Sequence, residues 1–260
     1  MSQTPSPVDS TSTSATSTHL TPGVLWTTAC IQRKDLTTEL FDAWYAEHMD
    51  ICLSCPGNGG LFLRYRNIDP AADVYVEPKW NEEPTSHNEV TSSTPTTWPF
   101  LALVKLDDTK WVASKQFNEM SRFSKLLPPE PDGSIGSAFS CWYGALRCYE
   151  TVGTIADPTG RTTRPKYILS VQMKGEEGPS AESWEAQDKP YVGRADFRGA
   201  VRYRIVEDLL AAQEPGWLPK GLVLYQFDGD EPPQAVVDEN CFKADVWEYM
   251  LEAGDSSLRL

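Results

Sequence analysis

Basic residues are scarce in this chain. Its 260 residues include 23 lysines and arginines against 37 aspartates and glutamates, which gives a net charge of −14 at pH 7. A field of this sign repels phosphate, so nucleic acid and anionic membrane surfaces are poor partners. The sequence also lacks any apolar run of about 18 residues, which argues against a membrane-spanning helix. The remaining composition is that of a globular protein that needs no disulfide or metal to fold.

Targeting and glycosylation signals are also missing. No lysine or arginine precedes Arg33, so the sequence shows neither a secretory nor a mitochondrial leader. Residues 1–22 hold six Ser and six Thr and too little apolar surface to offset the entropy of ordering, so we expect a disordered tail. There is no Asn-x-Ser/Thr acceptor, and six cysteines are scattered along the chain. These features favour a reducing, cytoplasmic location.

Motifs that hold cofactors or metals are absent. The chain has no Gly-x-Ser-x-Gly elbow, no Walker A or Gly-x-Gly-x-x-Gly loop and no His-Glu-x-x-His helix. Cys52 and Cys55 form a Cys-x-x-Cys without the second pair that a zinc site requires. We therefore expect no metal and no cofactor, and interpret the cysteines as small buried side chains.

An internal repeat is the most informative feature that is present. Residues 60–66 read Gly-Leu-Phe-Leu-Arg-Tyr-Arg, and residues 199–204 read Gly-Ala-Val-Arg-Tyr-Arg. A tryptophan precedes each run on a helix-like stretch, Trp44 in the first copy and Trp184 in the second. Such self-similarity indicates two copies of one supersecondary unit.

The same order of elements is predicted in both copies. A strand (25–31, 167–173) and a helix precede each Arg-Tyr-Arg strand, and a strand (100–106, 222–227) and a helix (109–127, 235–253) follow it. The first copy has a fourth strand at 138–152, which completes the βαββαβ, or ferredoxin-like, order of an α+β fold. No fourth strand is evident in the second copy, which we expect to lack its last strand.

Domain boundaries follow from the repeat. We expect a tail at 1–22, a first ferredoxin-like repeat at 23–154 with a polar insert at 70–98, a linker at 155–165 and a second repeat at 166–260. Alternation along the first Arg-Tyr-Arg strand places Leu61, Leu63 and Tyr65 on one face and the arginines on the other. The apolar face is expected to meet a helix layer, and the arginine face to meet water or a polar interior.

A family resemblance supports this architecture. The run Phe-Asp-Ala-Trp-Tyr-Ala-Glu-His-Met-Asp at 41–50 resembles the first helix of the EthD-like family, which often reads Trp-Tyr-x-x-His there. The strand at 64–66 and the segment 146–150 also resemble that family, mainly over residues 24–154. EthD-like proteins belong to the dimeric α+β barrel superfamily, so a tandem member implies a pseudo-dimer within one chain and a cavity between sheet and helices. Whether the halves close on each other or pair with a second chain stays open.

Candidate site residues lie on the first predicted helix and the following strand. His48 falls on the apolar stripe one turn after Trp44, where an imidazole can act as acid or base. Tyr45 and Tyr65 are candidate hydrogen-bond donors to a carbonyl or enolate. Substrate contacts are expected from the following side chains: Arg64, Arg66, Trp44 and His87.

Each of these residues also has a structural interpretation. A lone histidine on an apolar helix face is often a core residue, and paired arginines and buried tryptophans commonly stabilise a fold. In the second copy, Tyr45 and His48 correspond to Glu185 and Asp188. This difference between the copies is expected if only the first copy has a catalytic site. It is equally expected from neutral divergence of the two sequences.

The resemblance implies a small-molecule function. Superfamily members include cofactor-free cyclases, decarboxylases and monooxygenases, haem enzymes and proteins of unknown role, and tandem fungal members occur with secondary-metabolite enzymes. We therefore expect a cofactor-independent cyclase, isomerase or decarboxylase that acts on an apolar polyketide- or terpenoid-like intermediate. The alternative is a non-catalytic small-molecule-binding or stress-associated protein of the same fold.

Overall fold

The computed structural model describes residues 20–69, 72, 97–157, 159–161, 163–174, 179–210 and 218–260. Most of the predicted tail and almost all of the predicted insert lie outside these residues. Within them, no helix is long and apolar enough to cross a membrane.

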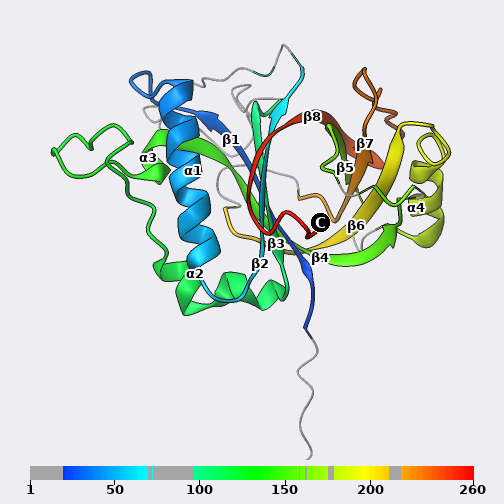
Figure 1. Cartoon of the computed structure of the whole chain (residues 1–260), viewed down its shortest axis with the longest axis horizontal. Coiled ribbons are helices and arrows are strands. Elements are labelled where there is room, and N and C mark those ends of the chain that lie inside the picture. Colours follow the sequence, from blue (N-terminus) through cyan, green and yellow to red (C-terminus); the bar gives the residue numbers. More distant parts are fainter. Residues whose placement is uncertain are drawn as a thin grey trace, which may run out of the picture.

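One antiparallel sheet of eight strands curves round and closes on itself, and helices lie against its outer surface (Figure 1). The strands are β1 Gly23–Ile31, β2 Asn58–Asn67, β3 Phe100–Leu106, β4 Trp142–Ile155, β5 Tyr167–Met173, β6 Phe197–Asp208, β7 Gly221–Phe227 and β8 Cys241–Gly254. The helices are α1 Thr38–Ser54, the 3₁₀ helix η1 Thr109–Ala113, α2 Lys115–Glu119, α3 Ala138–Cys141 and α4 Ala181–Asp188.

The strand order of the barrel repeats. It runs β1-β3-β2-β8-β5-β7-β6-β4 and returns to β1. Taken separately, the first half has the order β4-β1-β3-β2 and the second half β8-β5-β7-β6, which is fourth, first, third, second in both. Two seams join the halves, β2 with β8 and β4 with β6, so every strand is paired on both sides.

The strand faces are the reverse of those predicted. Leu61, Leu63 and Tyr65 point into the barrel and pack in its interior cluster. Phe62 belongs to the cluster beneath α1, and Arg64 of the same face meets Asp42 of that helix. The prediction was wrong because the barrel interior is filled by large aromatic side chains, while the arginine obtains a carboxylate from the helix.

Two predicted helices are also wrong. Over 109–127 the structure has only the short η1 and α2, because Ser114 between them is extended and its hydroxyl caps α2 by accepting from Phe117 N. Over 235–253 it has β8, the fourth strand that the second copy was expected to lack. There Asp245 and Trp247 are buried at a spacing of two, and backbone pairing with β2 and β5 decides the conformation.

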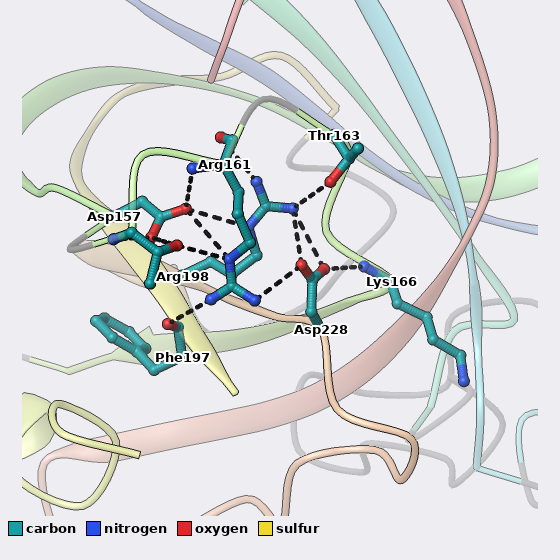
Figure 2. A network of polar contacts seen from close by, with 8 residues as sticks. Asp157, Arg161, Thr163, Lys166, Phe197, Arg198 and Asp228 are labelled. Carbon is teal, nitrogen blue, oxygen red and sulfur yellow. Dashed lines mark hydrogen bonds and ion pairs between the residues drawn. The ribbon is translucent and has the colours of Figure 1, made fainter. Parts of the chain in front are cut away.

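A charged network ties the predicted linker to the second half (Figure 2). Arg198 of β6 is 3% exposed and lies 3.4 Å from Asp157 and 3.2 Å from Asp228. Arg161 reaches the same Asp228 at 3.2 Å. Burial raises the pKa of Asp157, but hydrogen bonds from Thr159, Arg161 and Arg198 outweigh it and bring that pKa to about 2.

Candidate functional site

Helix α1 presents the predicted acid/base residue to the sheet. Its N-terminus is capped by Thr37, whose hydroxyl accepts from Leu40 N at 3.3 Å. At the other end, the side chain of Asn58 donates to the carbonyl of Cys52 at 3.0 Å, which satisfies one of the orphan carbonyls of the last turn. Fixed at both ends, the helix lays its apolar stripe across the outer face of the first half, on the left of the barrel in Figure 1.

A cavity of about 60 Å³ lies between α1 and this sheet face. Strands β1 to β4 form its floor, and the segment from α2 to α3 closes one side. Its wall is rich in aromatic rings, contributed by Trp44, Tyr45, Phe62, Phe117, Phe139 and Trp142. The polar and charged side chains among its lining residues are Thr27, Tyr45, His48, Cys52 and Arg122.

His48, on the apolar stripe of α1, is one of the residues that line this cavity. Its ring stacks on Trp44 with centroids 5.1 Å apart and an interplanar angle of 18°. The Nδ1 atom is buried and has no hydrogen-bond partner among the described residues. Burial, with a smaller contribution from the positive charge of Arg122, lowers the pKa of His48 to about 4, so its imidazole is neutral near pH 7.

Tyr45 and Trp44 lie beside His48 in the cavity wall. Burial raises the pKa of Tyr45 to about 12, although the nearby Arg64 guanidinium acts in the opposite direction. The phenol is therefore protonated at neutral pH and can donate a hydrogen bond. His48, Tyr45 and Trp44 are thus brought together as predicted, and their roles in chemistry stay predictions.

The predicted arginines do not line the cavity. Arg64 is fully buried, lies 2.5 Å from Asp42 and sits over the rings of Tyr45 and Phe100 at 4.3 and 5.0 Å. This environment is that of a cation that anchors α1 to β2. Arg66 is exposed at the end of β2, 5.8 Å from the centroid of Phe100.

Tyr65 and His87 are not placed with His48 either. Tyr65 points into the barrel, on the opposite face of β2 from the cavity, where it packs against Tyr249 with centroids 5.9 Å apart. Burial raises the pKa of Tyr65, and its hydroxyl has no partner among the described residues. His87 lies outside the described residues, so its predicted contact with substrate is untested.

Two cavity residues escaped sequence reasoning. Arg122 lies in the connection between β3 and β4, and Trp142 is the first residue of β4, so both are far along the chain from α1. No motif marks either residue, and the predicted long helix over 109–127 gave Arg122 no special place. Alternation along β4 was the one available signal, because it puts Trp142 on the helix side of the sheet.

The second half treats the equivalent position differently. Asp188 stands four residues after Trp184 on α4, as His48 stands four residues after Trp44 on α1. Its carboxylate pairs with Arg202 and accepts a hydrogen bond from the Tyr225 hydroxyl at 2.7 Å. The side chain in the second half is therefore satisfied internally, whereas Nδ1 of His48 is not.

Metal binding finds no support in the described part of the chain, where no three His, Cys, Asp or Glu side chains gather closely enough to hold an ion. The six cysteines are all free thiols, and burial raises the pKa of Cys52 in the cavity to about 12. Its thiol is therefore protonated at neutral pH and is a poor nucleophile.

Comparison with known proteins gives only distant similarities. No family model matches the chain, and no curated protein matches it. Among solved structures, an anthrone oxidase-like protein is 11% identical, with a TM-score of 0.45 over 91% of this chain and 94% of that one. A protein from Fusobacterium nucleatum subsp. nucleatum, provisionally described as a monooxygenase, is 7% identical, with a TM-score of 0.44 over 92% of this chain and 97% of that one.

Proposed function

We propose that this protein is an enzyme for a small, mostly apolar ring compound and that His48 exchanges a proton with it. One observation carries the proposal: Nδ1 of His48 is buried beside an aromatic cavity without a partner among the described residues. A buried polar atom of this kind costs free energy unless a ligand or water satisfies it. The paired Asp188 at the equivalent position shows that the fold can satisfy this site internally.

The cavity residues support acid/base chemistry without a bound cofactor. A neutral imidazole can take a proton from a carbon next to a carbonyl and return it elsewhere on the same molecule. Tyr45, protonated at neutral pH, can donate to the carbonyl oxygen as negative charge develops there. Isomerisation, cyclisation or decarboxylation of a polyketide- or terpenoid-like intermediate fits this pair of groups.

The architecture that we propose with this function is a fused pair of ferredoxin-like repeats of the dimeric α+β barrel type. The repeated strand order of the two halves and their reciprocal seams support it. In such a fusion one half can keep a working cavity while the other fills the matching place with an ion pair.

Binding of a small molecule without conversion is the second candidate function, and the size of the cavity supports it. A volume of about 60 Å³ accommodates a few water-sized groups, so a multi-ring substrate must displace part of the wall. Phe139 of α3, which is 48% exposed, is one wall residue positioned for such a displacement. A protein that binds only a ligand of about this volume, without converting it, would need no such movement.

The proposal is tested by comparing the small molecules that accumulate in cells that express this protein with those in cells that lack its gene. A compound that accumulates without the gene is purified and incubated with wild-type protein and with His48→Ala. If His48 transfers the proton, we expect the rate to fall by about two to four powers of ten in the variant.

The matched control is Asp188→Asn, at the equivalent position of the second half. It removes a charge from the Arg202 pair, so stability should fall while the rate per folded molecule stays at the wild-type value. A folded His48→Ala protein with an unchanged rate contradicts the assignment, and a compound that is bound but never converted favours the second candidate.

A further inference from the structure

Arg122 is a cation without a carboxylate in the cavity wall. Its guanidinium donates to the carbonyl oxygens of Phe117, at 3.0 Å, and Met120. Within the described chain, no aspartate or glutamate lies within ion-pair distance of it. Glu47 of α1, next to His48 in sequence, is held instead by the Ser124 hydroxyl, which donates to its carboxylate at 2.5 Å.

Aromatic rings hold this guanidinium in place. Its central carbon lies 5.2 Å from the ring centroid of Phe117 and 5.9 Å from that of Phe139. Both rings line the cavity. A half-buried guanidinium stacked and hydrogen-bonded in this way is already oriented, so little rotamer entropy is lost when it binds a ligand.

An unsatisfied hydrogen-bond donor lies in the same wall. The Trp142 indole is 7% exposed and lines the cavity, and its Nε1 is buried without an acceptor in the described part of the structure. Nδ1 of His48 is unpartnered in the same cavity. The wall therefore offers one positive charge and the unpartnered indole N–H of Trp142, with no carboxylate among its lining residues.

We propose that Arg122 and Trp142 form an anion-binding site and that the substrate is a planar aromatic acid held through its carboxylate. The inference rests on the proposed small-molecule function and names its substrate class. The aromatic wall accepts the ring, the guanidinium supplies the opposite charge, and the carboxylate satisfies the indole N–H. Bound there, the anion also raises the pKa of His48, so substrate binding makes the neutral imidazole a stronger base.

Benzoate and its neutral analogue benzamide test the site directly. Affinities are measured by NMR shift titration of the tryptophan indole signals in wild-type protein, Arg122→Met, Arg122→Lys and Trp142→Phe. Wild-type protein should bind benzoate about 10- to 100-fold more tightly than benzamide, the range expected of a charge-assisted hydrogen bond. Arg122→Met should lose this preference while benzamide affinity changes little, and Arg122→Lys and Trp142→Phe should each retain part of it.

Arg33→Met is the matched control, because Arg33 also donates to carbonyls of the β3–β4 connection, those of Pro128 and Pro129, but pairs with Asp35 outside the cavity. It should keep the full preference for benzoate. A preference that survives in Arg122→Met, or wild-type protein that binds neither compound, overturns the anion site.

His48→Gln separates this inference from the proposed function. The variant should keep the benzoate preference, because the anion contacts come from Arg122 and Trp142. A preference kept in His48→Gln and lost in Arg122→Met supports the anion site even if His48 proves not to transfer a proton. The reverse pattern overturns the anion site and leaves the role of His48 to its own rate measurement.

Discussion

At the residue scale, the two halves place different side chains at one position with opposite results. Asp188 is buried and is engaged by both Arg202 and Tyr225. His48 is neutral near pH 7 and leaves Nδ1 unsatisfied by the described residues. A folded protein tolerates such an atom at a cost of about 1–3 kcal/mol, so this site gives up stability that the other half retains.

His48 should make stability depend on pH. Its pKa is about 4 in the folded protein and 6.5 as a free imidazole, so between these values the unfolded chain takes up a proton that the folded chain refuses. The free energy of unfolding should therefore fall as pH drops from about 6.5 to about 4, by at most about 3 kcal/mol. Urea unfolding of wild-type protein and His48→Gln across this range measures the difference.

The His48→Gln substitution removes the titrating imidazole and leaves the other ionisable residues in place. Its loss of stability on acidification should be smaller than that of the wild type by the amount attributed to His48. Parallel curves for the two proteins would show that this imidazole is not shielded from protons in the folded state.

Sequence reasoning reached the helix side of the site and missed the loop side. The spacing of Trp44, Tyr45 and His48 follows the helical period, and that period is a property of the local sequence. Arg122, in the connection between β3 and β4, and Trp142, at the start of β4, join them only through the tertiary fold. The pairing of Arg64 with Asp42 was not predicted, because Asp42 lies on another element and a pairing of that kind leaves no trace in local periodicity.

At the element scale, β8 shows how a local pattern can mislead. Val237, Phe242, Val246 and Tyr249 recur at intervals close to a helical period, yet Val237 and Phe242 are 59% and 45% exposed. The strand forms because both of its edges pair, with β2 on one side and β5 on the other. Hydrogen bonds to distant strands are a tertiary effect that a short sequence window does not contain.

Gly254 is a critical residue of the seam between β2 and β8. Its φ is +95°, and an added Cβ would lie 2.1 Å from the carbonyl oxygen of Gly60 on the facing strand. Gly254→Ala should therefore destabilise the protein by about 2 kcal/mol or more beyond the intrinsic cost of a left-handed alanine. Thermal unfolding followed by circular dichroism measures the effect.

Gly133→Ala supplies the control for backbone strain. Gly133 has a similar φ of +82°, but nothing lies within 4 Å of its added Cβ. Its substitution should cost only about 1 kcal/mol. Equal losses from the two substitutions would mean that the seam adapts to the extra methyl group.

At the scale of the whole molecule, the barrel belongs to both halves together. Its interior cluster combines residues from each, and Trp26 of β1 meets Trp247 of β8 edge to face at 6.2 Å. Neither half alone closes a sheet, because β2 and β4 of the first half find their outer partners in the second. Folding should consequently be one cooperative event.

Separate expression of residues 20–155 and 156–260 tests this cooperativity. Each fragment exposes two strand edges and an apolar sheet face, so each should aggregate or self-associate when made alone. Co-expressed fragments should form a one-to-one complex on size-exclusion chromatography, with the circular dichroism of the intact chain. A single fragment that is monomeric and folded would contradict the expectation.

The ion pair between Asp188 and Arg202 also bears on how many ligand molecules one chain should bind. A homodimer with this architecture would have two identical cavities and would bind two ligand molecules per dimer. In the fused architecture that we propose, this ion pair occupies the place in the second half that corresponds to the cavity of the first, so we expect one ligand site per chain. A binding titration should therefore saturate at one molecule of ligand per chain.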